Sequence, residues 1–302
     1  MRPIEVLPLA CNAGMSAFKT IALIGRYNVS DATPLATMGA FLRKQGREVL
    51  VEKETAATSR ISGFPFADYE EIGARADLAV VQGGDGSMLN AARHLAAHRV
   101  PLVGVNLGRL GVMTDIASAK MLDAMAHILA GRHTIEERTM LAVEVRRDGG
   151  IEFSTVVLND AVVNKGAVLR LIEILVHIDG ESVYDLRSDG LIVATPTGST
   201  AYALSADGPI LQPSVPAFAL VPICSHTLSN RPIIVTDRSV IEITLQRSTD
   251  ARLHLDGQLE CKLLEGDQVT ISRAEHSIIF VHPPGYRYYA MLRGKLHWNE
   301  VL

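Results

Sequence analysis

Cysteine is scarce in this sequence. Three cysteines, Cys11, Cys224 and Cys261, are spread over 302 residues. An odd number of widely spaced cysteines, with no histidine at metal-site spacing, argues against a disulfide-built fold and against a zinc site. We therefore expect a protein of the reducing cytoplasm.

Basic residues are not in excess, and long apolar runs are missing. The sequence has 29 lysines and arginines against 33 acidic residues, which gives a net charge of −4. It lacks the basic runs of a nucleic-acid-binding protein and the run of about 20 apolar residues that crosses a bilayer. We expect neither nucleic acid nor a membrane as a partner. With 48% apolar and 21% charged residues, the chain can bury the core of one large domain or of two ordinary ones.

The N-terminus does not have the pattern of a signal peptide. Leu9-Ala10-Cys11 is similar to a lipoprotein cleavage site, but the stretch before it is short and contains Glu5 and Pro8. A second methionine, Met15, stands just before the first strand-like run. We therefore expect residues 1–16 to be a disordered extension, of which residues 1–14, before Met15, come from an upstream start codon.

The first half of the chain alternates short apolar runs with stretches of helical period. Buried strands are predicted over residues 21–24, 49–51, 78–81 and 102–105. Helices are predicted between and after them, over 34–45, 88–96 and 121–129. Thr33-Pro34 supplies an N-cap and a first-turn proline for the first helix. Continuous apolar strands separated by helices predict a parallel sheet covered on both faces.

After about residue 138 short strands replace the helical period. Two hairpins are predicted, one at Asp148-Gly149-Gly150 and one at Asp179-Gly180. Further strands are predicted over 240–245, 253–259, 269–272 and 278–282. The pattern therefore predicts an α/β domain of residues 17–137 and a β-rich domain of residues 138–282.

The segment Gly83-Gly84-Asp85-Gly86-Ser87 has the clearest chemical meaning. It follows a predicted strand and opens a predicted helix. Glycine lets backbone N–H groups approach a phosphate, and a helix N-terminus adds partial positive charge. A carboxylate beside a phosphate is out of place unless it does chemistry or meets a metal. A tight turn in which Asp85 only caps the helix is equally compatible with this motif alone.

Two further segments place polar side chains after strands. The loop Asn106-Leu107-Gly108-Arg109-Leu110-Gly111 follows the 102–105 strand, and ligands of open α/β sheets bind at such strand ends. Asn159-Asp160 ends another strand-like run and can bind hydroxyl or amide groups. Each segment taken alone is also typical of an ordinary connection or turn.

The longest polar segment begins with Arg187-Ser188-Asp189-Gly190 and, after the apolar run 191–194, continues from Thr195 to Tyr202 as Thr-Pro-Thr-Gly-Ser-Thr-Ala-Tyr. Its density of small hydroxyl residues exceeds what helix capping requires, and Tyr202 offers a flat face for stacking on a base. His226 has no partner for a triad or a metal site, which favours a structural role. Asp256-Gly257-Gln258 is typical of a hairpin turn.

In this order and at this spacing, the segments resemble the NAD kinase family. The resemblance runs from about residue 20 to the C-terminus. The segment Thr195–Tyr202 is its most specific part. The glycine-aspartate motif at Gly83–Ser87 is less specific, because phosphofructokinases and diacylglycerol and sphingosine kinases share it. Val112-Met113 replaces the commoner Phe-Leu, and Asp160 stands where many members carry glutamate. The resemblance implies a Rossmann-like α/β domain and a C-terminal β-sandwich, with residues 283–302 returning to the first domain.

The resemblance also implies an activity. The γ-phosphoryl group of ATP would pass to the 2′-hydroxyl of the adenosine ribose of NAD, giving NADP. Asp85 matches the catalytic aspartate that would accept the hydroxyl proton, and Gly83, Gly84, Gly86 and Ser87 would form the phosphate-binding loop. A divalent cation, usually Mg²⁺, would accompany ATP, with no dedicated metal ligands assigned in the chain. A homodimer or homotetramer is implied as well.

The positions that match the family's NAD ligands are Asp85, Gly86, Asn159, Asp160, Arg170, Arg187, Asp189, Thr200, Ala201, Tyr202, Ala203, Leu204, Ser205 and Gln258. Two other functions stay open on the residues alone. One is a non-catalytic NAD(P)-binding regulator, and the other is a lipid or sugar kinase that shares the glycine-aspartate motif. Formation of NADP from ATP and NAD would separate the three.

Overall fold

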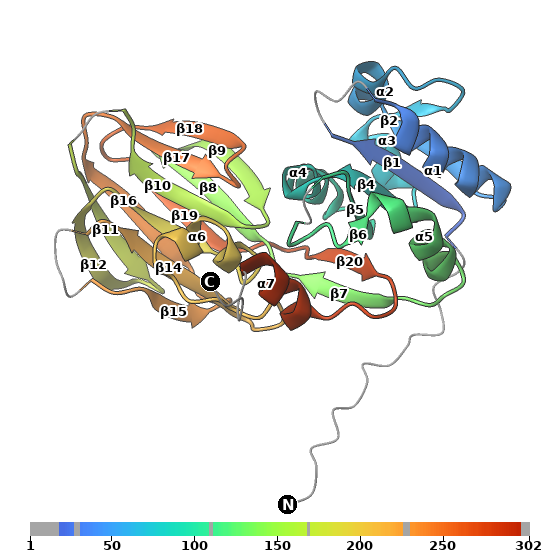
Figure 1. Cartoon of the computed structure of the whole chain (residues 1–302). Coiled ribbons are helices and arrows are strands. Elements are labelled where there is room, and N and C mark those ends of the chain that lie inside the picture. The colour runs from blue at the N-terminus through green and yellow to red at the C-terminus, as the bar shows by residue number, and fades with distance from the viewer. Residues whose placement is uncertain (1–17, 27–30, 109–110, 168–169, 226–229, 297–302) are drawn as a thin grey trace, which may run out of the picture. The chain divides into compact units, whose positions relative to one another are not determined.

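The computed structural model describes residues 18–26, 31–108, 111–167, 170–225 and 230–296. The chain forms two compact units (Figure 1). The first comprises Met1–Ala91, Val100–Glu136 and Ile279–Leu302, and the second comprises Ala92–Arg99 and Glu137–Ile278. Within the described ranges, no helix is long and apolar enough to span a membrane. The predicted disordered extension, residues 1–16, lies outside these ranges.

The first unit is built on an eight-stranded sheet. In spatial order its strands are β3 (Phe66–Ala67), β2 (Glu48–Glu52), β1 (Thr20–Gly25), β4 (Leu78–Gly83), β5 (Leu102–Asn106), β20 (Ile278–His282) and β7 (Thr134–Arg138), and β6 (Ile116–Ala117) pairs with β5. The parallel pairing of β1, β2, β4 and β5 confirms the predicted sheet. The strand order reverses between β1 and β4, and ligands of open α/β sheets bind beyond the carboxyl ends at such a point.

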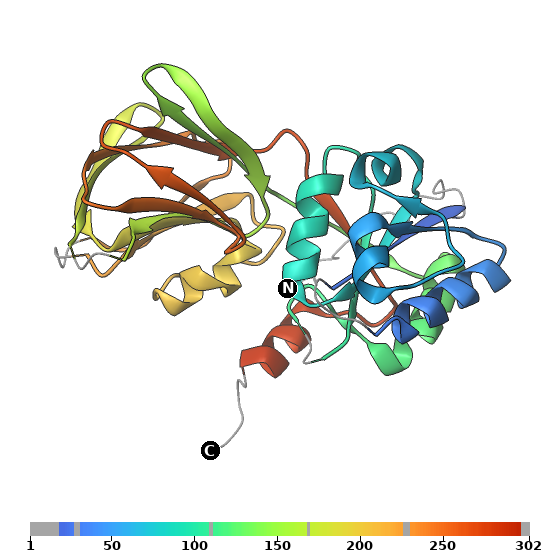
Figure 2. The ribbon, with the colours of Figure 1, turned by 90° about the horizontal axis from the view of Figure 1, so that it is seen from above.

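Helices pack on this sheet because its central strands are apolar on both faces. The helices in this part of the chain are α1 (Thr33–Lys44), α2 (Lys53–Ser59), α3 (Tyr69–Arg75), α4 (Asp85–Leu95), the short η1 (Ser118–Lys120) and α5 (Met121–Leu129), and α7 (Tyr288–Leu296) follows β20. Leu35 and Met38 of α1 share a buried cluster with Met125 of α5 and Leu23 of β1. Figure 2 shows α1 in blue and α5 in green side by side on one face. The apolar stripes predicted from the sequence thus face the sheet.

The start of α1 differs from the capping pattern predicted for it. Thr33, the predicted N-cap, is the first helical residue, and Ala32 precedes it without a side-chain cap. Asp31 Oδ1 accepts a hydrogen bond from the Thr33 N–H at 2.9 Å. An aspartate two residues upstream therefore satisfies a helix-terminal donor, and Pro34 stays in the first turn as predicted.

The second unit contains two six-stranded antiparallel sheets. In spatial order, one has β15 (Ile233–Thr236), β14 (Ala217–Ile223), β13 (Gly190–Ala194), β10 (Asp160–Lys165), β17 (Ala251–Leu255) and β18 (Leu259–Leu263). The other has β12 (Glu181–Ser188), β11 (Ile172–Ile178), β16 (Ile241–Arg247), β19 (Gln268–Arg273), β8 (Leu141–Arg147) and β9 (Gly150–Val157). Apolar residues of both sheets, among them Val163, Val193, Ile174 and Ile243, form one buried cluster. This packing confirms the β-sandwich.

Asp-Gly turns connect three of the hairpins. Asp148-Gly149 joins β8 to β9 with φ of 50° and 82°, and Asp179-Gly180 joins β11 to β12 with φ of 52° and 83°. Both hairpins were predicted. Asp256-Gly257, with φ of 53° and 63°, divides the predicted 253–259 strand into β17 and β18. Positive φ at both central residues is the turn geometry that Asp-Gly adopts most readily.

The C-terminal strand joins the first sheet, and this corrects the prediction. The sequence pattern places 278–282 among the strands of the β-rich domain. Instead β20 pairs in parallel with β5, with Phe280 opposite Leu102, and lies between β5 and β7 (Figure 1). The boundary predicted after residue 282 therefore falls beyond a strand of the first sheet. A short apolar run predicts a strand but not the sheet that it joins.

Candidate functional site

The Gly83–Ser87 segment forms the predicted turn from strand to helix. Gly83 ends β4, and Asp85 is the first residue of α4. The N–H groups of Ser87 and Met88 donate to the Gly84 carbonyl at 3.0 and 3.3 Å. The Asp85 carboxylate accepts hydrogen bonds from another segment instead. The reading of Asp85 as a cap of its own helix is therefore wrong.

The loop after β5 holds the Asp85 carboxylate. The Val112 N–H donates to Oδ2 at 2.8 Å, and the Met113 N–H donates to Oδ1 at 3.0 Å. Both donors belong to the backbone, so Val112-Met113 in place of Phe-Leu leaves these bonds intact. Among the described residues Oδ2 accepts only this bond, and a carboxylate oxygen has two lone pairs. Oδ2 thus keeps one lone pair for a substrate hydroxyl.

Thr114 completes this network, although no motif in the sequence marks it. Its side chain is buried, and its hydroxyl accepts from Asn106 Nδ2 at 2.8 Å and from the Gly111 N–H at 3.2 Å. The same hydroxyl lies 3.4 Å from Asp85 Oδ1. The described part of the loop predicted from Asn106 to Gly111 is thus folded around the carboxylate, while residues 109–110 lie outside the described ranges.

Two glycines in these turns serve different purposes. A Cβ on Gly111 would lie 1.9 Å from Asp85 Oδ1, so the loop approaches the carboxylate only because this residue has no side chain. Among the described residues, a Cβ on Gly84 would have no atom within 4 Å, and no positive φ requires glycine there. Since the chain itself does not need a glycine at this position, Gly84 suits the close approach of an external group such as a phosphate.

The other residues of the predicted phosphate loop differ in exposure. Gly86 is exposed, as a ligand-binding backbone requires. Ser87 is buried, and its Oγ lies 2.3 Å from where a Cβ of Gly83 would stand. The Ser87 side chain therefore packs on the turn.

In the second unit, three strand ends meet at one edge of a sheet. β10 begins at Asp160, and its neighbours β13 and β17 end at Ala194 and Leu255. Antiparallel neighbours run in opposite directions, so the start of β10 lies beside the ends of both. This topology brings Asn159-Asp160 next to the start of the Thr195–Tyr202 segment and to Asp256.

The Asp256 carboxylate stabilises this edge of the sheet by accepting three backbone hydrogen bonds. Its Oδ1 accepts from the N–H groups of Asn159 at 2.7 Å and Asp160 at 3.2 Å, and its Oδ2 accepts from Leu158 at 3.1 Å. Gln258, a predicted NAD ligand, closes the same turn by donating its N–H to the Leu255 carbonyl at 2.9 Å. The segment is thus a hairpin turn whose aspartate fixes the backbone of Asn159 and Asp160.

A cavity of about 450 Å³ opens beside this edge. It is lined by Asn159, Asp160, Val162, Asn164, Ala201, Tyr202, His254, Asp256 and Gly257. Asp160, Val162 and Asn164 share one face of β10 because side chains alternate along a strand. Asn159 Oδ1 and Asn164 Oδ1 are buried without a hydrogen-bond partner in the described part of the chain. Unsatisfied acceptors in a cavity indicate a ligand that donates hydrogen bonds.

The sequence prediction missed Asn164 and His254 among the lining residues. Asn164 lies four residues after Asp160, on the same face of one strand, so strand alternation was a usable signal. His254 lies opposite Val162 on the neighbouring strand β17. That pairing depends on the register between two strands far apart in the sequence, which no local pattern shows.

Burial raises the pKa of Asp160 to about 7, and the nearby charge of Asp256 contributes in the same direction. Burial also raises the pKa of Asp256, against the three N–H groups that stabilise its carboxylate. Near neutral pH the Asp160 carboxyl therefore exists in both protonation states. It can accept a hydrogen bond from a ligand hydroxyl or donate one.

Most hydroxyl groups of the Thr195–Tyr202 segment hold the loop itself together. Thr195 Oγ1 donates to the Leu158 carbonyl at 2.5 Å, and Ser199 Oγ donates to the Pro196 carbonyl at 2.6 Å. A Cβ on Gly198 would lie 2.0 Å from the Asn159 carbonyl oxygen, so glycine permits the loop to pack against Asn159. The hydroxyl density is thus largely structural. Tyr202, in contrast, is 45% exposed and lines the cavity.

The other residues predicted in this segment lie at the end of η2 (Gly198–Thr200), at Ala201 and in the short helix α6 (Tyr202–Ser205). Thr200, Ala201 and Leu204 are half-buried and Ser205 is exposed. Ala203 is fully buried in an apolar cluster, so only its backbone can reach a ligand.

Of the predicted NAD ligands, Asn159, Asp160, Ala201 and Tyr202 line the cavity and the others do not. Asp189 pairs with Lys165, with Oδ1 2.6 Å from Nζ. Arg187 is exposed on β12, where its Nε lies 3.9 Å from Glu173 Oε1. Arg170 is exposed after β10. Their role in binding stays a prediction, and His226 lies outside the described residues.

The described residues contain no group of three or more histidine, cysteine, aspartate and glutamate side chains that could hold a metal ion. Asp85 is the carboxylate at the glycine-rich turn. Mg²⁺ in nucleotide sites is commonly held by one or two carboxylates together with substrate phosphates and waters. The donor set at the turn therefore fits a cation that arrives with a nucleotide.

Both halves of the chain match models of one family. The model of the ATP-NAD kinase N-terminal domain matches residues 22–133, and that of the ATP-NAD kinase C-terminal domain matches residues 158–283. The first range contains Asp85 with the loop that holds it. The second contains the cavity of the second unit.

Named relatives agree with these matches. The NAD kinase of Aromatoleum aromaticum is 52% identical over 286 residues, which cover 94% of this chain and 95% of the relative. The NAD kinase of Chromobacterium violaceum is 49% identical over 286 residues, which cover 94% and 98% of the two chains.

Two solved structures share the fold. Yeast NADH kinase complexed with NADH superimposes with a TM-score of 0.87 at 24% identity, covering 95% of this chain and 90% of that chain. An NAD kinase from Archaeoglobus fulgidus in complex with ATP gives a TM-score of 0.71 at 24% identity, covering 92% and 98%. The resemblance and the two-part fold predicted from the sequence are confirmed, and the chain belongs to the NAD kinase family of phosphotransferases.

Proposed function

We propose that this chain transfers the γ-phosphoryl group of ATP to the 2′-hydroxyl of the adenosine ribose of NAD, giving NADP and ADP. The observation that carries the proposal is the Asp85 carboxylate, which two backbone N–H groups hold at the N-terminus of α4. A protein that only binds dinucleotides has little use for a carboxylate at a phosphate-binding turn. Phosphoryl transfer to a hydroxyl needs a group that orients the hydroxyl and takes its proton.

Asp85 acts as the proton acceptor in this mechanism. Its Oδ2 accepts the hydrogen bond of the 2′-hydroxyl and takes the proton as the ribose oxygen bonds to the γ-phosphorus. The bond from that phosphorus to the β,γ-bridging oxygen breaks, and ADP leaves. Because Val112 and Met113 already fix the carboxylate, little reorganisation is needed during the reaction. The backbone of Gly84 and Gly86 holds phosphate oxygens.

A divalent cation, in our proposal Mg²⁺, would arrive with the phosphates of ATP, and Asp85 is the carboxylate at the turn that would hold it there. When bound, it neutralises the charge that develops on the phosphate oxygens. The protein contributes one ligand to this cation, the Asp85 carboxylate at the turn. The described residues contain no preassembled metal site.

The cavity of the second unit binds the adenosine portion of NAD. The adenine amino group donates hydrogen bonds, which suits the unsatisfied oxygens of Asn159 and Asn164. The Asp160 carboxyl suits a ribose hydroxyl, and the exposed face of Tyr202 suits stacking on a base. Arg170, Arg187, Asp189, Gln258 and the Thr200–Ser205 segment are proposed to contact other parts of the dinucleotide.

Incubation of the protein with ATP, Mg²⁺ and NAD tests the reaction directly. We expect NADP as the product. Binding of NAD without turnover would instead identify a dinucleotide-binding regulator. Neither binding nor turnover would direct the search to another acceptor, such as a lipid or a sugar.

The substitution Asn159→Ala tests the assignment of the cavity. We expect NAD affinity to fall about tenfold, the loss of one or two hydrogen bonds, while ATP affinity changes less than about twofold. The backbone N–H of residue 159 still bonds Asp256 in the variant, so the sheet edge is retained. Calorimetric titration with each nucleotide measures both affinities. Equal losses for NAD and ATP would contradict this placement of NAD.

The family resemblance further supports a homodimer or homotetramer. The small and odd number of cysteines supports a cytoplasmic protein. Sedimentation analysis of the purified chain and fractionation of its native cell would test these two proposals.

A further inference from the structure

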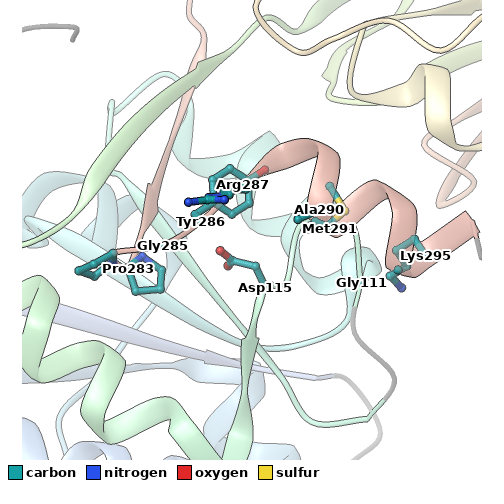
Figure 3. Close-up of a pocket in the computed structure, with 11 residues that line it drawn as sticks. Gly111, Asp115, Pro283, Gly285, Tyr286, Arg287, Ala290, Met291 and Lys295 are labelled. Atoms are coloured by element: carbon teal, nitrogen blue, oxygen red, sulfur yellow. The ribbon is translucent and has the colours of Figure 1, made fainter. Parts of the chain in front are cut away.

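The first unit has a cavity of its own, with a volume of about 1010 Å³. Gly111 and Asp115 line one side. The other side is lined by the C-terminal segment, residues 283–295, through side chains that include Tyr286, Arg287 and Lys295 (Figure 3). Small-molecule sites usually have volumes of roughly 300–1,000 Å³. The cavity is therefore large enough for a nucleotide.

This cavity adjoins the carboxylate assigned to catalysis. Gly111 stands between them, because a Cβ on Gly111 would lie 1.9 Å from Asp85 Oδ1. Apart from Asp85 and Gly86, the residues predicted to bind NAD all belong to the second unit. The NAD assignment therefore does not account for this cavity.

Asp115 presents an unsatisfied acceptor at the cavity. Its Oδ2 lies 3.0 Å from His282 Nδ1, whereas its Oδ1 is buried without a hydrogen-bond partner among the described residues. The side chain is 10% exposed. Figure 3 shows the carboxylate directed toward the segment that carries Tyr286 and Arg287. A buried acceptor of this kind calls for a donor from a ligand.

His282 holds Asp115 in this position. The imidazole is buried, with Nε2 3.3 Å from Glu136 Oε2, and it stacks on Tyr286 with ring centroids 3.7 Å apart. A carboxylate on each ring nitrogen favours the imidazolium form, which donates from both nitrogens. Asp115 is thus a fixed element of the cavity wall.

Arg287 and Lys295 give the opposite wall a positive charge. Within the described part of the chain, neither side chain forms an ion pair. Guanidinium and ammonium groups are the usual partners of phosphates. A ribose phosphate complements both walls. Its hydroxyl groups can donate a hydrogen bond to Asp115, and its negative charge can pair with Arg287 and Lys295.

We propose that this cavity binds the nucleotide that donates the phosphoryl group, with Asp115 Oδ1 accepting from a ribose hydroxyl and Arg287 and Lys295 facing the phosphates. The inference rests on the proposed function, because it assigns a place to the donor of that reaction. It makes the C-terminal segment part of the donor site, next to the loop that holds Asp85.

The double substitution Arg287→Gln with Lys295→Gln tests the cationic wall. Calorimetric titrations of the full chain use the non-hydrolysable ATP analogue AMP-PNP with Mg²⁺ and, separately, NAD. We expect the affinity for AMP-PNP to fall about tenfold or more, while the affinity for NAD is retained. Arg293→Gln is the matched control, because Arg293 is exposed on the same helix and does not line the cavity. It should change neither affinity.

Unchanged AMP-PNP affinity in the double variant would overturn the proposal, and so would equal losses for both ligands. The wild-type protein provides a second test that needs no substitution. We expect 2′,3′-dideoxy-ATP to bind about tenfold more weakly than ATP, because it lacks the ribose hydroxyls. Equal affinity would overturn the contact with Asp115. These titrations require no turnover, so a failure to form NADP would count against the reaction and not against this site.

Discussion

Asp85 and Asp256 show how one residue type serves two purposes in one chain. Asp256 accepts three backbone N–H groups at 2.7–3.2 Å and fastens a sheet edge, whereas Asp85 accepts two and keeps a lone pair on Oδ2. Each is followed by glycine in the sequence. The sequence could not separate the two roles, because the N–H donors come from segments far away along the chain.

Asp160 should make the stability of the protein depend on pH. Burial raises its pKa from 3.8 to about 7, so the folded chain binds this proton more tightly than the unfolded chain. The contribution of Asp160 to stability is complete below about pH 4 and is lost as pH rises toward 7. We therefore expect Asp160→Asn to increase the free energy of unfolding above pH 7 by at most about 4 kcal/mol.

Denaturant titrations at pH 5, 6, 7 and 8 measure this effect. The gain from Asp160→Asn should grow with pH up to about 7 and then become constant. Asp148→Asn, on the exposed turn between β8 and β9, removes the same charge and should give no comparable gain. A gain from Asp160→Asn that is the same at every pH would show that its ionisation is not the cause.

At the level of elements, the sequence predicted individual strands and turns better than it predicted which strands pair. The parallel strands of the first sheet and the hairpins at Asp148 and Asp179 were all evident from apolar runs and Asp-Gly pairs. Helix α2 was missed, because Glu52 caps it and glutamate is not among the usual N-caps. The sheet to which β20 belongs was also missed, since strand partners are set by tertiary packing.

The loop that holds Asp85 should tolerate a methyl group at one glycine and not at another. A Cβ on Gly111 would lie 1.9 Å from Asp85 Oδ1 and 2.4 Å from Thr114 Oγ1, so the carboxylate or the loop must move. A misplacement of about 1 Å can lower a rate about 100-fold, and we expect Gly111→Ala to lower kcat by this order. Initial-rate measurements at saturating ATP and NAD determine kcat.

Gly108→Ala is the control within the same loop. Within the described ranges its Cβ would meet only Asn106 Oδ1, at 3.9 Å, which is an ordinary contact. We expect its kcat to stay within about twofold of the wild type. Similar losses in both variants would mean that the loop, and not the approach to Asp85, is sensitive to substitution.

At the scale of the whole molecule, the chain returns to its first unit after building the second. Residues 279–302 belong to the first unit, where β20 lies between β5 and β7. His282, at the end of β20, lies between the carboxylates of Asp115 and Glu136. These contacts tie the C-terminal segment to the loop region that follows β5.

This connection should weaken at alkaline pH. Burial lowers the pKa of His282, but the carboxylates of Asp115 and Glu136 outweigh it, so the net shift is upward from 6.5. The stabilisation is therefore complete below about pH 6.5 and is lost as pH rises through the raised pKa. We expect His282→Gln to destabilise the protein most at pH 6 and less at pH 10. Denaturant titrations check this, and a pH-independent difference would contradict it.

The substitution Asp85→Asn tests the central claim most directly. Asparagine has nearly the same shape, but it cannot take the hydroxyl proton, and its amide NH₂ meets a backbone N–H where an oxygen should accept. NADP formation from ATP, Mg²⁺ and NAD is compared among the wild type, Asp85→Asn and Asp123→Asn, which removes an exposed carboxylate of α5. We predict that Asp85→Asn folds normally and that its kcat falls by about 100-fold or more, while Asp123→Asn keeps the wild-type rate. NADP formation by Asp85→Asn near the wild-type rate would contradict the account.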